Sequence, residues 1–219
     1  DALQKIRAYA FPVKLTDTTR AALAPRAQQD DPAGRALRRL LADPADAEAA
    51  KTATMDAGVN SVLHTTCTPT LLSAGHAPNA LPQRATANVN CRIMPGGSPQ
   101  AVRDVLVKLI DDPKITVEAP EADKPVALDP PMDPRVIGPM RKLAAKHFPG
   151  VPLVPAMSSG ATDGVYFGGL GMPIYGVPGI FGEPDGNGAH GLNERMRARS
   201  LYEGRDYLFE LVKAYVGAK

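Results

Sequence analysis

The N-terminal residues have the pattern of a helix followed by a loop. Apolar Leu3, Ile6 and Tyr9 recur at helical spacing and predict a helix that starts at the first residue. A short extended piece over residues 11–15 and a turn over residues 16–19 follow. Since the helix has no capping residue before it and no signal peptide precedes it, we interpret the N-terminus as a cut and expect further chain upstream.

The next stretch is rich in alanine and predicts small helices. Asp31 and Asp43 each stand directly before a proline, which combines an N-cap acceptor with the favoured first helical residue. We therefore expect helices over residues 35–41 and 45–54. The segment has no catalytic constellation, so we interpret residues 17–60 as a helical packing or interface insertion.

A β-hairpin is predicted next, because β-branched residues and threonine dominate residues 62–72 and 84–93. The connecting loop covers residues 73–82, and a pairing symmetric about Asn79 defines the register. The pairs on the resulting apolar face are Thr65 with Ile93, Cys67 with Cys91, Pro69 with Val89, and Leu71 with Ala87.

The opposite face of this hairpin is polar and is a candidate ligand surface. Its pairs are Thr66 with Arg92, Thr68 with Asn90, and Thr70 with Asn88. The guanidinium of Arg92 is the only charged group among them. A ligand that binds this sheet is therefore expected on the face that carries Arg92.

Cys67 and Cys91, the two cysteines of the chain, face each other in this register. We expect their Cα atoms within about 7 Å, the limit for a disulfide without backbone movement. Cross-strand Cβ atoms lie roughly 4.5 to 5.5 Å apart, against roughly 3.5 to 4.5 Å in a relaxed disulfide, so two free thiols are slightly favoured. A periplasmic or secreted location would favour oxidation, and the sequence leaves the compartment open.

The elements after the hairpin complete a first domain over residues 1–119. Ser98 is placed to cap a helix that continues to Asp111, and residues 114–118 predict a strand. Together with the N-terminal helix and the hairpin, this order suggests an α+β, ferredoxin-like β-α-β-β-α-β sandwich that lacks its first strand.

A second unit is expected over residues 135–219, after a proline-rich linker at residues 120–134. Its predicted elements are a helix over residues 134–148, a strand near Leu153, a short helix over residues 162–169, a strand over residues 172–177, and a helix over residues 193–216. Alternation of helix and strand is typical of α/β proteins. The strands are too few for a complete domain, so we interpret this unit as the end of a larger α/β domain.

Composition and charge narrow the class of protein. The chain has 25 Lys and Arg against 23 Asp and Glu, a formal net charge of +2, with the basic residues scattered. This balance argues against nucleic acid as a partner. Apolar runs are interrupted well before the roughly 18 residues needed to cross a bilayer, so no membrane span is predicted.

Two glycine-rich loops contain the residue types most suited to chemistry. His190 lies in one of them, where glycines let the backbone approach a ligand or an ion closely. A surface histidine without function is an equally good reading of this residue. Asp163 lies in the other loop, and capping of a short helix is its simplest role. Phosphate-loop and Gly-x-Ser-x-Gly motifs are absent, which argues against nucleotide binding and serine hydrolase chemistry.

Three motifs follow one another over residues 68–196. They are TPTLLSAGHAPNALPQRATANVNCRIMPGGSP, SSGATDGVYF and GAHGLNERM. Their order and spacing resemble the second half of an M20-type metallopeptidase, the group of aminoacylases, carboxypeptidases and deacetylases with two zinc ions. The long insertion before the hairpin is similar to the branch of vacuolar Gly-X carboxypeptidases and N-acyl amino acid hydrolases.

The resemblance implies roles for five residues. Asn79 and Arg92 would bind the carboxylate of a peptide or N-acyl amino acid substrate, and Gly160 and Thr162 would line its pocket. His190 would be the last zinc ligand, whereas Asp163 would be structural. The resemblance also implies a lid domain that forms a homodimer and interrupts a catalytic α/β domain.

The family's remaining catalytic residues have no counterpart in this sequence. The His-x-Asp ligand pair and the Glu-Glu pair with the general base are both missing, and a lid histidine belongs upstream. One imidazole cannot hold two metal ions, so we expect the parent protein to be a hydrolase and this fragment to be inactive. The alternative is a non-catalytic ferredoxin-like module for small-molecule binding or dimerisation. Upstream sequence with or without these two motifs would decide between them.

Overall fold

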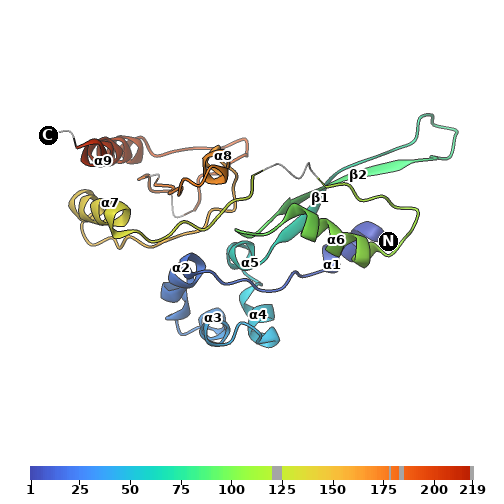
Figure 1. Cartoon of the computed structure of the whole chain (residues 1–219), viewed down its shortest axis with the longest axis horizontal. Coiled ribbons are helices and arrows are strands. Elements are labelled where there is room, and N and C mark those ends of the chain that lie inside the picture. The colour runs from blue at the N-terminus through green and yellow to red at the C-terminus, as the bar shows by residue number, and fades with distance from the viewer. Residues whose placement is uncertain (120–124, 178, 183–184, 218–219) are drawn as a thin grey trace. The chain divides into compact units, whose positions relative to one another are not determined.

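The computed structural model describes residues 1–119, 125–177, 179–182 and 185–217, and the chain divides into two compact units. The first unit contains residues 1–129 and 155–173, and the second contains residues 130–154 and 174–219. The elements are α1 (Ala2–Ala8), α2 (Asp17–Ala27), α3 (Pro32–Ala42), α4 (Ala47–Ala53), α5 (Ala57–Leu63), β1 (Thr66–Ala74), β2 (Ala85–Arg92), α6 (Pro99–Ile110), α7 (Pro134–His147), α8 (Gly164–Gly169) and α9 (Ala198–Val216) (Figure 1).

Helices α2–α5 form a helical insertion between α1 and β1. Its core is formed by its own residues, among which Leu37, Leu40 and Leu63 are fully buried. Where the insertion begins and ends, the backbone N–H of Lys14 donates to the carbonyl of Leu63 at 2.9 Å. The insertion therefore leaves and rejoins the rest of the unit at one place.

Three boundaries of the insertion differ from those predicted. The expected turn at residues 16–19 is instead the start of α2, where the hydroxyls of Thr16 and Thr19 each accept from the other's backbone N–H. Asp43 ends α3, and Asp46 caps α4 by accepting from Ala49. Turn-forming Thr and Asp side chains also cap helices, so the residue types alone did not distinguish the two outcomes.

The third difference is α5, which occupies the start of the first predicted strand. Asp56 caps this helix by accepting from the backbone N–H of Val59 at 3.0 Å. Val59 and Leu63 are buried on its inner face. This helical burial outweighs the β preference of residues 62–63, and β1 begins only at Thr66.

The hairpin of β1 and β2 is antiparallel, and it has the predicted register in the half near its base, over residues 66–69 of β1. Cys67 pairs with Cys91 and Pro69 with Val89. A register shift between Pro69 and Leu71 then places Leu71 opposite Asn88, so the predicted pairing of Leu71 with Ala87 is wrong. Proline has no N–H to donate to the ladder, which is why bulges tolerate it.

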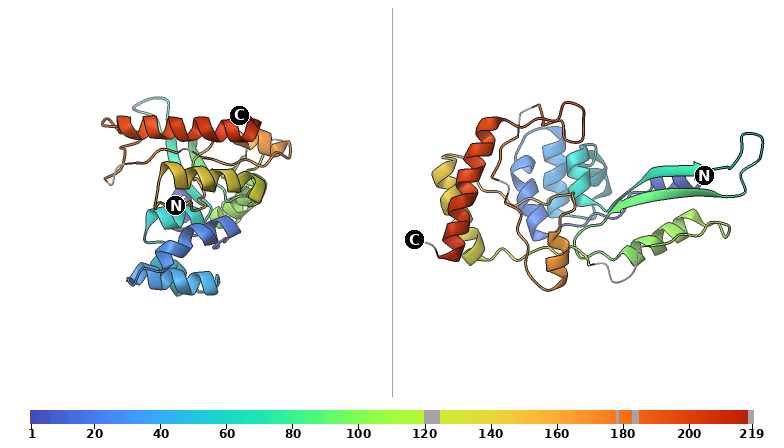
Figure 2. Two further views of the ribbon diagram at one scale, coloured as in Figure 1. Left: turned by 90° about the vertical axis from the view of Figure 1, so that its left-hand side faces the viewer. Right: turned by 90° about the horizontal axis from the view of Figure 1, so that it is seen from above.

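Helices α1 and α6 pack on the apolar face of the hairpin. Their buried contacts are Ile6 from α1 with Val102, Leu106 and Ile110 from α6. Ser98 caps α6 as predicted, and the ammonium of Lys5 donates to the carbonyl of Ile110 at 2.5 Å. The hairpin extends beyond these two helices, and its tip is exposed (Figures 1 and 2).

The other predicted strands are not formed in the part of the chain that the structure describes. Residues 114–118, 153 and 172–177 lie outside regular structure, and β1 and β2 pair only with each other. The apolar patterns are typical of strands, but a strand needs a hydrogen-bonding neighbour, and no described segment supplies one. The expected ferredoxin-like order is thus reduced to helix, hairpin and helix. Part of the predicted linker, residues 120–124, lies outside the described residues.

The second unit is built on the packing of α7 against α9. Met140, Ala144, Tyr207 and Leu211 form its buried core. Helix α7 has the predicted bounds to within one residue, whereas α9 starts at Ala198 and not at residue 193. Residues 188–194 form successive turns instead, in which Gly191 donates to the carbonyl of Gly188.

Candidate functional site

Arg92 is the last residue of β2 and lies on the polar face of the hairpin, opposite Thr66. Its exposed guanidinium donates to the backbone carbonyl of Ser159. This contact joins the end of the hairpin to the loop before α8, which belongs to the same unit. A guanidinium held at one N–H keeps its other donors for a ligand, and its fork fits both oxygens of a carboxylate.

The loop that receives Arg92 also carries the two predicted pocket residues. The N–H of Gly160 donates to the hydroxyl of Ser158 at 3.1 Å, and the hydroxyl of Thr162 accepts from Gly164 at 3.2 Å. Asp163 makes no capping hydrogen bond, so its predicted capping role is wrong. The N–H groups of Val165 and Tyr166 donate instead to the backbone carbonyls of Thr162 and Asp163. Arg92, Gly160 and Thr162 are therefore brought to one part of the first unit.

Ser159 is a contact that the sequence reasoning missed. It supplies a backbone carbonyl, which every residue type has, so its side chain gave no sign of the contact with Arg92. The only available signal was its place inside the motif SSGATDGVYF.

Asn79 lies in the exposed tip of the hairpin, at the end away from Arg92. Ala85 of β2 pairs with Ala74 beside the tip, whereas Arg92 pairs with Thr66 at the base. At about 3.3 Å per residue, β2 separates the tip from Arg92 by about 23 Å. In this conformation of one chain, Asn79 and Arg92 do not lie close enough to bind the same carboxylate.

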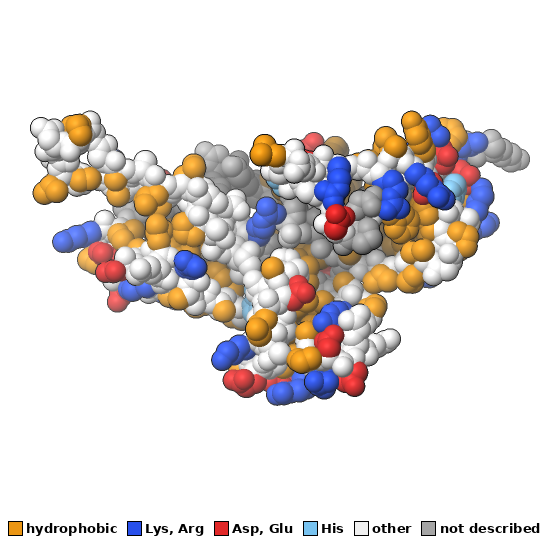
Figure 3. All heavy atoms as spheres, turned by 180° about the vertical axis from the view of Figure 1, so that it is seen from behind, with side chains coloured by type: hydrophobic (Ala, Val, Ile, Leu, Met, Phe, Trp, Pro, Cys, Tyr) orange, Lys and Arg blue, Asp and Glu red, His pale blue; other side chains and the backbone are white. Residues whose placement is uncertain are grey.

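The whole hairpin is free of acidic side chains. No Asp or Glu occurs between Asp56 and Asp104, and Arg84 and Arg92 are the arginines of the hairpin. On the face shown in Figure 3, the projecting arm carries apolar and uncharged side chains, whereas Lys, Arg, Asp and Glu mix over the helices. This composition suits a ligand that is itself anionic.

His190 belongs to the second unit and is exposed in a glycine-rich loop. Its backbone is left-handed with φ of 64°, and its N–H donates to the carboxylate of Glu194 at 3.2 Å. A non-glycine residue in this conformation is uncommon and is strained unless local contacts support it. The hydrogen bond with Glu194 is one such contact.

The described residues do not amount to a metal centre. Among them, no three His, Cys, Asp or Glu side chains are grouped closely enough to hold an ion. His190 can contribute one imidazole, whereas a protein zinc site normally needs three or four ligands. No step of a reaction can therefore be assigned to a metal from these residues.

None of the described helices combines the length and the apolar character needed to cross a membrane.

Comparisons with known proteins give matches of three kinds. Residues 2–118 match the family model of the peptidase dimerisation domain. The N-fatty-acyl-amino acid synthase/hydrolase of Homo sapiens is 30% identical over 158 residues, which is 70% of this chain and 31% of that protein. A probable carboxypeptidase S-like 2 of Dictyostelium discoideum is 22% identical over 156 residues, which is 71% of this chain and 30% of that protein.

A solved structure supports the fold. The M20 family metallo-carboxypeptidase from Sulfolobus solfataricus matches with a TM-score of 0.63 and 20% identity, over 98% of this chain and 52% of that one. Residues 2–118, which include α1, the hairpin and α6, match the family model and form a peptidase dimerisation domain. The chain belongs to the M20 family of peptidases, which are hydrolases, as its three motifs predicted. It spans about a third of the length of the curated relatives named above.

Proposed function

We propose that this chain is part of a zinc-dependent M20 hydrolase that cleaves an amide bond beside a free carboxylate, in a dipeptide or an N-acyl amino acid. The observation that carries the proposal is Arg92, which presents its guanidinium on an acid-free hairpin beside the loop of Gly160 and Thr162. The names of the relatives agree with it, because N-acyl amino acids and carboxypeptidase substrates both place a free carboxylate next to the scissile amide.

In this proposal Arg92 binds the carboxylate with two parallel hydrogen bonds, and Gly160 and Thr162 line the pocket. Asn79, at the far end of the hairpin, is not part of this carboxylate site within one chain. His190 is one ligand of a zinc ion whose other ligands these residues do not supply. The 219 residues alone are therefore inactive, and chemistry needs the family's further ligands and general base.

The first unit serves in this proposal as a ferredoxin-like lid that forms a homodimer. The family model describes a dimerisation domain, and the helix, hairpin and helix order is the central part of a ferredoxin-like sandwich. This family assignment also supports the alternative function, a non-catalytic module that dimerises or binds a small carboxylate. The two functions differ in whether the protein turns over an amide.

Replacement of Arg92 by lysine tests the proposed function. In a protein that carries this chain together with the M20 catalytic residues, R92K should raise KM for an N-acyl amino acid about tenfold or more and change kcat little. Lysine keeps the charge but cannot form two parallel hydrogen bonds to a carboxylate.

The matched control is Arg84→Lys, since Arg84 is an exposed arginine just before β2, near the tip of the same hairpin. It should leave KM unchanged. Unchanged kinetics in a folded R92K protein would refute the carboxylate-binding role. Absence of any amide hydrolysis in the complete protein would favour the non-catalytic alternative.

A further inference from the structure

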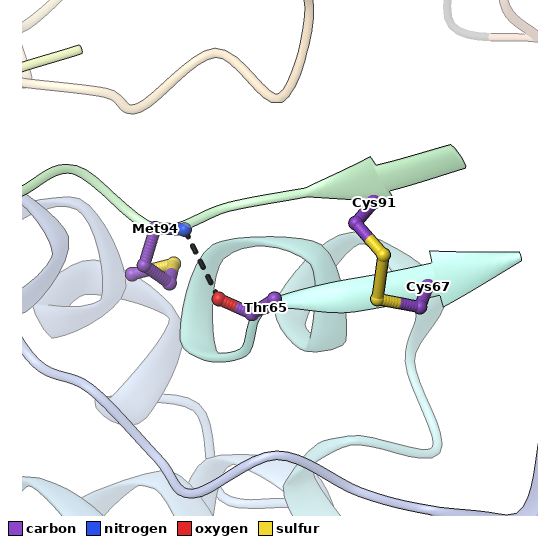
Figure 4. The surroundings of a disulfide bond; sticks show 4 residues. All are labelled: Thr65, Cys67, Cys91 and Met94. Carbon is purple, nitrogen blue, oxygen red and sulfur yellow. Dashed lines mark hydrogen bonds between the residues drawn. A yellow bond between two sulfur atoms is a disulfide. The ribbon is translucent and has the colours of Figure 1, made fainter. Parts of the chain in front are cut away.

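The hairpin is tied across its base by a covalent bond. The structure joins Cys67 and Cys91 in a disulfide with a Cα–Cα distance of 4.1 Å, and neither cysteine is free (Figure 4). The predicted proximity within about 7 Å is confirmed, whereas the slight preference for free thiols is wrong. The short Cα–Cα distance is that of a non-hydrogen-bonded cross-strand pair, the closer of the two kinds.

The disulfide lies on the opposite face of the sheet from Arg92. Cys67 and Cys91 pack against the buried cluster that α1 and α6 form around Ile6 and Leu106. Arg92 follows Cys91 directly, and successive residues of a strand point to opposite faces. The backbone at Cys91 is thus anchored in the apolar core, one residue before the guanidinium that reaches Ser159.

Beyond Arg92 the chain is held by non-covalent contacts. The N–H of buried Met94 donates to the hydroxyl of Thr65 at 3.2 Å (Figure 4), and Ile93 packs against the cluster of α1 and α6. Arg92 is the last residue of β2, and in the described part of the chain β2 pairs only with β1. Strand ends fray, and a two-stranded sheet has few ladder hydrogen bonds to oppose this fraying. The bulge beginning at Pro69 interrupts the regular ladder two residues beyond Cys67. The disulfide is the one covalent link between the strands, and it lies next to the pair of Thr66 and Arg92.

We infer that the disulfide of Cys67 and Cys91 is a positioning device for Arg92, which holds the guanidinium where it binds the carboxylate of the substrate. The inference rests on the proposed role of Arg92 in carboxylate binding. When the disulfide is broken, only non-covalent contacts hold the end of β2, and the guanidinium more often samples positions from which it cannot form both hydrogen bonds. Carboxylate affinity falls as a result, while the chemistry that follows binding does not change.

The experiment measures KM and kcat for an N-acyl amino acid in the protein that carries this chain together with the M20 catalytic residues. Four forms are compared: the parent, Cys67→Ser with Cys91→Ser, Arg92→Ala, and all three changes together. Breaking the disulfide should raise KM about three- to tenfold with kcat nearly unchanged. In the Arg92→Ala background it should raise KM no further, because the group that it positions is gone.

Reduction of the unmutated protein provides a second route, in case the serine variant does not fold. A dithiol such as dithiothreitol gives two electrons and two protons to the disulfide, which becomes two thiols, and the reagent is oxidised to its cyclic disulfide. The folded, reduced protein should show the same rise in KM, and the serine variant should not respond to the reagent.

The outcomes separate this inference from the proposed function. If Arg92→Ala raises KM but neither breaking nor reducing the disulfide does, the positioning role is wrong and the role of Arg92 stands. An equal rise in KM with and without Arg92 would also overturn it, because the disulfide would then act elsewhere. If Arg92→Ala leaves KM unchanged, the proposed role of Arg92 fails, and the inference fails with it.

Discussion

Helices α2–α5 and the segment over residues 149–197 are of similar length, but they fold by different means. Every helix of the insertion starts with a side-chain cap, and the helices bury apolar residues against one another. The described part of the later segment has only α8, a helix of six residues with no buried residue. Its large apolar side chains are mostly exposed: Val151, Leu153, Val154, Tyr166, Phe167, Leu170, Met172, Ile174, Phe181, Leu192 and Met196.

The difference shows where each region finds its packing partners. In the insertion, a residue and its neighbours in the core are close in sequence, so short helices with good caps are sufficient. In residues 149–197, the apolar side chains have strand-like patterns, and a strand is stable only beside another strand. Three of the five residues predicted to bind substrate or metal, Gly160, Thr162 and His190, belong to this second kind of region.

Among the tests of this comparison, the largest change in the free energy of unfolding is expected for a substitution of Leu37. Leu37→Ala empties a fully buried position of the insertion and should lower the free energy of unfolding by about 2–5 kcal/mol. Leu192→Ala makes the same chemical change at a fully exposed position and should cost less than about 0.5 kcal/mol. Equilibrium urea unfolding followed by circular dichroism measures both. Equal losses would show that the later segment has a core of its own.

A smaller effect is expected from glycine replacements. Gly34→Ala would place a Cβ only 2.0 Å from the backbone carbonyl oxygen of Gln29, and should cost about 1–3 kcal/mol. Gly176→Ala meets nothing within 4 Å and needs no left-handed backbone, so it should be neutral or stabilise by up to about 1 kcal/mol. Thermal unfolding of the two variants checks the signs. A destabilised Gly176→Ala protein would reveal close packing around residue 176.

The next effect depends on pH and concerns Asp46. The backbone N–H of Ala49 and the guanidinium of Arg39 lower the pKa of Asp46 below its usual value of 3.8. Because the pKa is lower in the folded state, the stabilisation is complete above pH 3.8 and is lost as the pH falls through the lowered value. Asp46→Asn should therefore show a weaker loss of stability than the parent between about pH 5 and pH 2. Parallel acid-unfolding curves would contradict this linkage.

No effect at all is expected from zinc on the 219-residue chain. After dialysis the purified chain should hold less than one zinc ion, and added zinc should leave its unfolding midpoint unchanged, because His190 alone cannot form a site. It should also fail to hydrolyse N-acyl amino acids or dipeptides. Metal analysis that finds two tightly bound ions per chain would contradict this prediction. It would show that the chain supplies further metal ligands besides His190.

The sequence predicts those features that local chemistry decides. Asp31 and Ser98 cap helices as expected, because each is followed by proline and by good helix formers. The pairing of Cys67 with Cys91 followed from a hairpin symmetric about Asn79. Beyond Pro69 the register shifts, because a bulge depends on how the strand bends and not on residue pattern alone.

Other features depend on contacts that no local pattern contains. Residues 114–118 and 172–177 have apolar patterns typical of strands, yet both remain unpaired in the described chain. For the candidate site, the pattern placed Arg92 on the polar face but could not predict that its guanidinium reaches Ser159, 67 positions later. Such a contact joins parts of the chain that only the folded unit brings together.

The hydrogen bond between Lys14 and Leu63 has a consequence for the order in which the chain folds. Helix α1 must find α6 across about a hundred residues, a distance that slows folding when the intervening chain is disordered. Once α2–α5 have formed from local contacts, the ends of the insertion are held together, and the effective loop becomes much shorter. The rest of the domain can therefore fold around the insertion. Deletion of the insertion would leave the topology of the domain unchanged.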